Sequence, residues 1–136
     1  QVKIQIGSAY PLPAEKTMPV RGRNLVTGLP EAIDISSVEI RESLAASVQV
    51  IIDTIKDAID EAPPEIVADL IETGICLAGG SSQLQGLVER VSDELHLRVW
   101  VTEDPMTCVA RGAGMILEDL DRYSQFLVGL ERNGNR

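Results

Sequence analysis

The residues of this sequence that could do chemistry lie at a turn of small residues after an apolar run. Ile75-Cys76-Leu77-Ala78 leads directly into Gly79-Gly80, and polar residues follow from Ser81 to Gln83. Glycine permits positive φ and lets a ligand approach the main chain without a Cβ in the way. A helix that begins there would offer unpaired N–H groups to an anion. The turn is therefore a candidate ligand site, and a tight turn that only leads into a helix is the alternative.

The two common phosphate-binding motifs are absent from the sequence. It contains neither Gly-x-Gly-x-x-Gly nor Gly-Lys-Ser/Thr. His96 is the only histidine and has no partner at triad or metal-ligand spacing, while Glu39, Glu42 and Asp53 have the pattern of a solvated helix face. We therefore predict no catalytic residue and no metal site within this sequence.

Composition and charge narrow the class of protein. The chain has 136 residues, 44% of them hydrophobic and 24% charged, which is typical of a soluble globular domain. A formal net charge of −9 disfavours nucleic acid as a partner, since phosphate backbones attract clustered Lys and Arg. No apolar run reaches the roughly 18 residues of a spanning helix. The sequence begins at Gln1, within an alternating pattern, and we expect an upstream part of the protein to precede it.

The cysteine pattern indicates a reducing compartment. Cys76 and Cys108 each lie in an apolar segment, with no Cys or His at ligand spacing. We predict buried, reduced thiols in a cytoplasmic protein.

The first part of the chain is expected to form a small antiparallel β-rich lobe, residues 1–36. Residues 2–6 alternate apolar and polar side chains, as in a half-buried strand. Residues 17–23 and 31–35 are two further short strand candidates, and Pro19 places the first of these at a sheet edge.

The second part, residues 37–123, is expected to form a helix-flanked α/β lobe. Ser36 and Glu39 form a capping box that opens a long helix, which ends before Pro63-Pro64. The later elements should be a helix at 65–71, a buried strand at 75–78, a helix opened by a second capping box at 82–85, a strand at 97–102, and a helix from Asp104-Pro105 to Tyr123. This order is typical of an α/β layered sheet. Residues 124–136 show no periodicity, and we expect a frayed tail.

The last predicted helix has an apolar face and several small residues. Met106, Val109, Ala110, Ala113, Ile116, Leu117 and Leu120 should face inward. Gly112 and Gly114 make this helix narrow, which predicts that another element packs very close to it.

Several motifs together resemble the MreB family of bacterial actin homologues. In chain order they are Thr27-Gly28-Leu29-Pro30, Val38-Glu39-Ile40-Arg41-Glu42-Ser43-Leu44, Ala62-Pro63-Pro64-Glu65, Gly74-Ile75-Cys76-Leu77-Ala78-Gly79-Gly80, and Glu103-Asp104-Pro105-Met106-Thr107-Cys108-Val109-Ala110 with Gly112. The resemblance keeps order and spacing to about residue 121. Residues 2–8 are also similar to the segment just after the family's adenine-contacting helix. The sequence therefore resembles the C-terminal part of such a protein.

The resemblance implies the ATPase fold shared by actin, Hsp70 and sugar kinases. Residues 1–36 would be part of subdomain IIB, and residues 37–123 part of subdomain IIA. The family forms cytoplasmic ATP-binding filaments that organise cell-wall synthesis for rod shape at the inner face of the membrane. The implied partners are further copies in a protofilament and proteins of the cell-wall elongation machinery. Membrane contact would come only from segments outside this sequence.

The resemblance also assigns roles to the turn. It makes Gly79, Gly80, Ser81, Ser82 and Gln83 the adenosine motif, which backs the ribose and α-phosphate side of ATP, and places Met106 in the adenine pocket, with helix-core packing as the alternative for Met106. Ser81 stands where the family commonly has a third glycine. Both phosphate loops, the Mg2+-linked carboxylates and the residue that positions water belong to upstream sequence, so ATP hydrolysis is expected only of the full-length protein.

Two other classes remain open at this stage. A carbohydrate kinase has a C-terminal lobe of the same fold with a similar Gly-Gly turn, although the small antiparallel lobe argues against it. A non-catalytic interaction module, whose glycines are only structural, is the second. Arg21 and Arg23 lie in the small lobe, which contacts the next subunit in actin-like filaments; two solvated arginines on a hairpin are the alternative.

Overall fold

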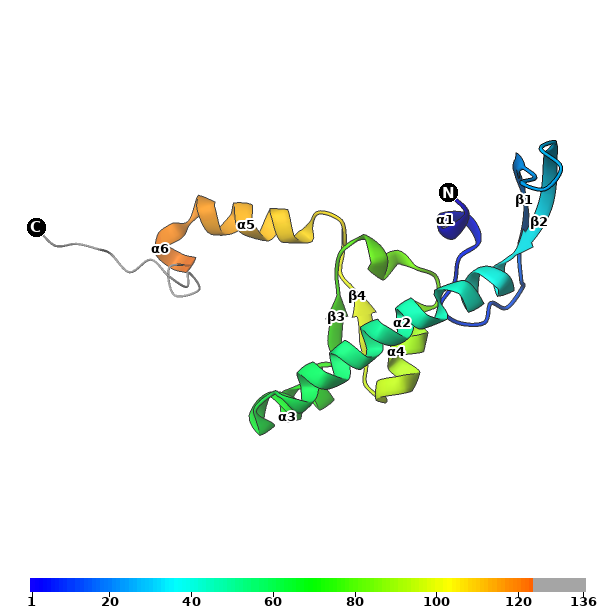
Figure 1. The fold of residues 1–136 in the computed structure, drawn as a ribbon. Helices are drawn as coiled ribbons and strands as arrows, with labels where there is room; N and C mark the ends of the chain where they lie inside the picture. The colour runs from blue at the N-terminus through cyan, green and yellow to red at the C-terminus, as the bar shows by residue number, and fades with distance from the viewer. Residues whose placement is uncertain (124–136) are drawn as a thin grey trace, which may run out of the picture.

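The computed structural model describes residues 1–123 as a mixed α/β chain (Figure 1). The elements are α1 (Val2–Ile6), β1 (Thr17–Arg23), β2 (Pro30–Ser36), α2 (Ser37–Asp60), α3 (Pro64–Thr73), β3 (Ile75–Leu77), the 3-10 helix η1 (Gly80–Gln83), α4 (Leu87–Leu95), β4 (Val99–Val101), α5 (Cys108–Glu118) and α6 (Leu120–Tyr123). The frayed tail expected at 124–136 lies outside the described residues. No helix among residues 1–123 is both long and apolar enough to span a bilayer.

Strands β1 and β2 form the expected antiparallel hairpin, which leads directly into α2. Their register runs from Thr17 opposite Ser36 to Arg23 opposite Pro30. At the tip, the Asn24 side-chain oxygen accepts hydrogen bonds from the Val26 and Thr27 amides, at 2.8 and 3.1 Å. This side chain thus stabilises the turn in the way asparagine commonly does.

Residues 2–6 form helix α1, so the prediction of a strand there is wrong. An alternation of five residues also places Val2 and Ile6 four apart, on one face of a helix. Ile6 is buried while Ile4 is exposed, and the Gly7 amide donates to the Lys3 carbonyl at 3.0 Å. So short a pattern does not distinguish a strand from one helical turn.

The predicted capping box begins α2 as expected. The Ser36 hydroxyl accepts from the Glu39 amide, and the Glu39 carboxylate accepts from the Ser36 amide. The bond from the Ser36 amide, and then a bond from the Ser36 hydroxyl to the same carboxylate, hold the pKa of Glu39 below its ordinary value. Further along the chain, Pro64 occupies the first turn of α3, also as expected.

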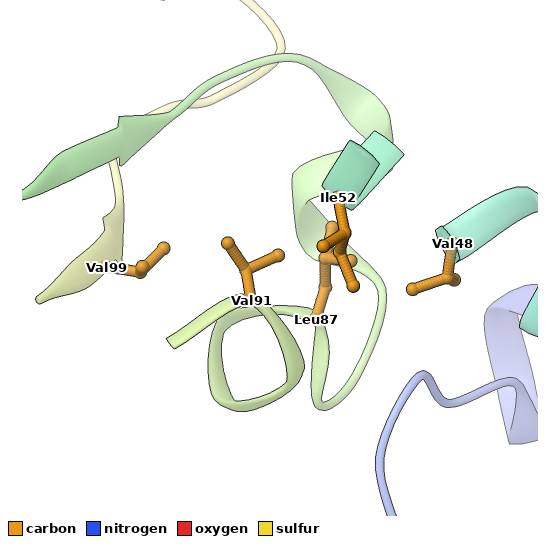
Figure 2. Close-up of a cluster of buried hydrophobic side chains, with 5 residues drawn as sticks. All are labelled: Val48, Ile52, Leu87, Val91 and Val99. Atoms are coloured by element: carbon orange, nitrogen blue, oxygen red, sulfur yellow. The ribbon is translucent and has the colours of Figure 1, made fainter. Parts of the chain in front are cut away.

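The hydrophobic core forms where α2 crosses α4 and β4. Its buried members are Val48, Ile52, Leu87, Val91 and Val99, which Figure 2 shows converging from these three elements. Strand β3 pairs in parallel with β4, from Ile75 opposite Val99 to Leu77 opposite Val101. Ile75 and Leu77 pack against the core cluster, so this face of the sheet meets the helices.

The other face of the β3–β4 sheet is open, which corrects two predictions. Cys76 is exposed and Cys108 is half-buried, so the prediction of buried thiols is wrong. Trp100, which stands opposite Cys76, is also exposed, with the Arg98 guanidinium 5.3 Å from its ring centroid. An apolar run predicts a strand correctly, but its burial on both faces depends on elements that cover it.

The helix expected from Asp104-Pro105 begins later and ends earlier. Asp104 accepts through its main-chain oxygen from the Thr107 and Cys108 amides, and its carboxylate pairs with Arg111 at 2.8 Å rather than capping a helix. Helix α5 therefore begins at Cys108, and a break at Asp119 separates it from α6.

Helix α5 projects away from the core (Figure 1). Val109 is 76% exposed, and Leu117 and Met106 are exposed as well, so their inward orientation was predicted wrongly. A Cβ built on Gly112 or Gly114 would meet no atom within 4 Å. The sequence pattern of a packed face is present, but these side chains remain exposed.

The segment between α1 and β1 is held to the start of α2 by polar contacts. Arg41 of α2 forms an ion pair with Glu15 at 2.8 Å, and the Ser37 hydroxyl also donates to Glu15. The buried Ser37 hydroxyl accepts from the Lys16 amide at 2.8 Å, and the Ser37 amide donates to the Lys16 carbonyl at 2.8 Å. These contacts fix the base of the hairpin to the helix.

Replacing Ile52 by Ala should destabilise the protein through the core. Ile52 is fully buried, and the cavity left by its side chain should lower the free energy of unfolding by about 2–5 kcal/mol. Val50→Ala is the control, because Val50 lies on the same helix and is 64% exposed; it should change the value by about 0.5 kcal/mol or less. Urea unfolding measures both, and equal losses would contradict this assignment of the core.

Replacing Glu15 by Gln should remove part of the pH dependence of stability. The Arg41 guanidinium and then the Ser37 hydroxyl lower the pKa of Glu15 from 4.5 to about 2. Because the pKa is lower in the folded chain, the stability from this carboxylate is present above pH 4.5 and is lost as the pH falls toward 2. Urea midpoints across this range should fall less steeply in Glu15→Gln than in the wild type. Glu42→Gln, at an exposed carboxyl on α2, should keep the wild-type slope.

Candidate functional site

Three segments that are far apart in the sequence line an open cavity of about 490 Å3. They are α1, the turn through η1, and the loop before α5. The lining residues are Lys3, Ile4, Gly7, Gly80, Ser81, Gln83, Leu84, Gln85 and Met106. The glycine turn predicted from the sequence therefore lies at a hollow of ligand size.

Local geometry explains both glycines of the turn. Gly79 has φ of 83°, a conformation that favours glycine, and its amide donates to the Pro105 carbonyl at 2.7 Å. Gly80 has no such backbone demand, but a Cβ there would lie 2.8 Å from the sulfur of Met106. The first glycine thus shapes the turn, and the second leaves room for Met106 and for the cavity.

Four of the six residues predicted for the site line the cavity: Gly80, Ser81, Gln83 and Met106. The other two do not. Gly79 forms the bend, and the buried Ser82 hydroxyl donates to the Gly79 carbonyl at 2.7 Å. Gly79 and Ser82 thus stabilise the turn without lining the cavity. Ligand binding by the six predicted residues stays a prediction.

The second capping box, expected at 82–85, was predicted wrongly. Residues 80–83 form a 3-10 helix, Leu84 is extended, and α4 begins only at Leu87. Gly86 precedes α4 with φ of 74°, and a Cβ there would lie 2.6 Å from the Tyr10 Cβ. The glycine turn therefore offers the main chain of a single 3-10 turn, and no α-helix begins at it.

The wall formed by α1 was missed by the sequence reasoning. Lys3, Ile4 and Gly7 line the cavity, although the pattern of this segment indicated a strand. The similarity of residues 2–8 to the segment beside an adenine-contacting helix was the signal that could have found them. Main-chain contacts hold this wall to the turn: Ser8 bridges Gln85, and the Ala9 amide donates to the Gln85 carbonyl at 2.7 Å.

The cavity combines apolar surface with one positive charge. Ile4, Leu84 and Met106 are its apolar members, and Lys3 is the only charged residue among those that line it. Among residues 1–123 no group of three or more His, Cys, Asp or Glu side chains is placed to hold a metal ion. The arrangement suits a ligand with a flat apolar part and a negatively charged part.

Known proteins similar to this chain share one family and one fold. The profile of the family described as MreB/Mbl protein matches residues 1–125. The cell shape-determining protein MreB of Escherichia coli (strain K12) is 40% identical over 123 residues, covering 90% of this chain and 35% of that protein. The cell shape-determining protein Mbl of Bacillus subtilis (strain 168) is 38% identical over 121 residues, covering 89% of this chain and 36% of that protein.

Solved structures agree with the sequence matches. Crystal structures of MreB5 of Spiroplasma citri bound to ADP and to AMPPNP match this fold with TM-scores of 0.84 and 0.83, both at 29% identity. The matches cover 91% of this chain and 38% and 37% of those chains. The fold is therefore part of the actin-like class, with a small antiparallel sheet as predicted. The chain belongs to the MreB/Mbl family, and it spans 35–36% of the length of the two relatives named above.

Proposed function

We propose that this chain supplies the adenosine side of an ATP pocket in a bacterial actin-like filament protein of the cytoplasm that determines cell shape. The observation that carries the proposal is the cavity, where Gly80 and Met106 meet α1. It is supported by the family match and by the nucleotides named for the Spiroplasma citri structures. The family match also leaves no support for the carbohydrate-kinase alternative.

The lining residues suit a nucleotide in three respects. Ile4 and Met106 offer apolar surface on which a purine ring can lie. Gly80 offers main chain without a Cβ, which permits close approach of a sugar or phosphate. Lys3 brings positive charge toward the phosphates. The remaining phosphate contacts, Mg2+ and hydrolysis are assigned to residues outside this chain.

Filament formation is the second part of the proposal. The hairpin and the α2–α3 junction lie at opposite ends of α2 (Figure 1). At the hairpin end Leu25 and Val26 are 96% and 95% exposed, and Arg21 and Arg23 form no ion pair within residues 1–123.

The junction end has the complementary character. Its exposed acidic residues are Asp57, Asp60, Glu61, Glu65, Asp69 and Glu72, and Ile66 and Ile71 are exposed beside them. We assign the hairpin of one copy to the α2–α3 junction of the next. Because the two patches differ, the contact joins subunits head to tail, and repetition gives a filament. In this assignment residues 1–36 and 37–123 are two lobes that meet where Ser8 and Ala9 contact Gln85. Partners in cell-wall synthesis are proposed for the whole protein, and membrane contact for segments outside this chain.

Replacing Gly80 by Val should weaken nucleotide binding. The branched side chain would enter the cavity and displace Met106, so the affinity of the full-length gene product for a fluorescent ATP analogue should fall at least about tenfold, or about 1.4 kcal/mol. Anisotropy titration measures this loss.

Gly22→Val is the matched control for Gly80→Val. Gly22 lies on β1, has no strained backbone, and a Cβ there would meet no atom within 4 Å. This control should bind the analogue like the wild type. Unchanged affinity in a folded Gly80→Val protein would reject the nucleotide site and leave the interaction-module reading.

Reversing the charges of the hairpin should weaken assembly. The double variant Arg21→Glu/Arg23→Glu would face the acidic junction of the next copy, so the critical concentration for filament formation should rise at least about tenfold. Adding Asp60→Arg and Glu61→Arg should restore part of the loss, because the two ends again carry opposite charges. Pelleting and light scattering measure both effects, and an unchanged critical concentration in the double variant would reject this contact.

A further inference from the structure

Arg41 of α2 contacts two segments that precede it in the chain: the one just after α1 and the one just before β1. Its guanidinium donates to the Ser8 hydroxyl at 3.1 Å and to the Tyr10 carbonyl at 3.4 Å, just after α1. It also donates to both oxygens of Glu15, at 2.8 and 3.3 Å, just before β1. The Arg41 side chain is only 19% exposed, so these bonds are partly shielded from water. One side chain therefore donates to four acceptor atoms on three residues.

The first two acceptors belong to the wall of the cavity. Ser8 is fully buried and follows Gly7, which lines the cavity. Ser8 and Ala9 also contact Gln85, which lies on the opposite wall. A shift of Ser8 would therefore move the α1 wall relative to the glycine turn.

The other two acceptors belong to the base of the hairpin. Glu15 also accepts a hydrogen bond from Ser37, and Ser37 exchanges two hydrogen bonds with Lys16. Strand β1 begins at the next residue, Thr17, which pairs with Ser36. The position of Glu15 therefore sets where the hairpin begins relative to α2.

A guanidinium suits acceptors that are spread over three residues better than an ammonium does. Nη1 of Arg41, which has two N–H groups, faces Ser8, Tyr10 and one Glu15 oxygen, and Nη2 faces the other Glu15 oxygen. A guanidinium has five N–H donors in a fixed plane, whereas an ammonium is a single point with three. Lys at position 41 would keep the charge attraction to Glu15 but could not span Glu15, Ser8 and Tyr10.

We propose that Arg41 is a positioning residue that fixes the α1 wall of the cavity and the base of the hairpin to the same point of α2. Its link to ligand binding and assembly rests on the function proposed above. Through this shared anchor, a ligand that orders the α1 wall also orders the hairpin, which couples the cavity to the filament contact.

Backbone amide hydrogen exchange on the full-length gene product tests the anchor without any ligand. The Ala9 amide reports the cavity wall through its bond to Gln85, and the Ser37 amide reports the hairpin base through its bond to Lys16. In Arg41→Ala both amides should exchange at least about tenfold faster. In Glu15→Ala only the Ser37 amide should do so, because the contacts of Arg41 with Ser8 and Tyr10 remain.

Two further variants keep the test decisive. Arg41→Lys should speed exchange at Ala9 and leave Ser37 near the wild-type rate, and it serves if Arg41→Ala does not fold. Lys56→Ala is the matched control: it removes a cation further along α2, where Lys56 pairs with Glu94 of α4 at 3.2 Å. Unchanged exchange at Ala9 in both Arg41 variants would overturn the proposal. Equal acceleration in Lys56→Ala would also overturn it, by showing general destabilisation.

Nucleotide affinity and assembly then separate this proposal from the function on which it rests. Arg41→Ala should lower the affinity for the ATP analogue at least about tenfold and raise the critical concentration, while Glu15→Ala should raise only the critical concentration. If the exchange pattern is as expected but the wild type binds no nucleotide, the anchor stands and the proposed function fails. If nucleotide binds and the exchange pattern is absent, the anchor fails and the proposed function stands.

Discussion

Burial of Ile52 against α4 and β4 is the constraint on which the rest of the arrangement depends. It fixes the middle of α2, a helix of 24 residues whose two ends reach well beyond the core. The hairpin and Arg41 lie at one end of this helix, and the acidic α2–α3 junction lies at the other (Figure 1). Because a helix is rigid over this length, one buried contact sets the separation and orientation of both proposed contact surfaces.

The glycine turn lacks the α-helix N-terminus that often binds an anion. A helix N-terminus would offer several aligned N–H groups and a dipole to an anion. Here α4 begins only at Leu87, after Gly86, where a Cβ would lie 2.6 Å from the Tyr10 Cβ, and residues 80–83 form a short 3-10 helix. The site therefore depends on shape, through the bare Gly80 and the neighbouring Met106, and on the Lys3 charge from α1. This division suits the adenosine end of a nucleotide better than its phosphates.

Local signals in the sequence predicted the elements that have local causes. Ser36 and Glu39 cap α2 through their own side chains, and Pro64 begins α3 because its fixed φ suits a first turn. Four residues of the cavity were likewise found through motifs. The α1 wall was not, because five alternating residues are compatible with either a strand or a helical turn, and only the contact of Ser8 and Ala9 with Gln85 places it.

Burial was harder to predict than secondary structure, since it depends on a second element. Val109 and Leu117 have the spacing of a packed helix face, and Cys76 lies in an apolar run, yet all three side chains are exposed. An apolar pattern in the sequence shows that a helix or strand face favours burial, but the face is buried only where another element packs against it. Among residues 1–123 only the face of the sheet toward α2 and α4 finds that partner.

Polar contacts act together with the core in holding the functional segments in place, since Ala9 and Leu84 also pack against the core cluster. Ser8 and Ser37 are fully buried although neither lies in the hydrophobic cluster, and no buried side-chain nitrogen or oxygen within residues 1–123 lacks a hydrogen-bond partner. Hydrogen bonds are directional, so they fix an orientation that apolar packing would leave adjustable. Removing one partner leaves another buried and unsatisfied, which makes such a network cooperative. A cavity wall and a hairpin tied to one guanidinium can thus shift together.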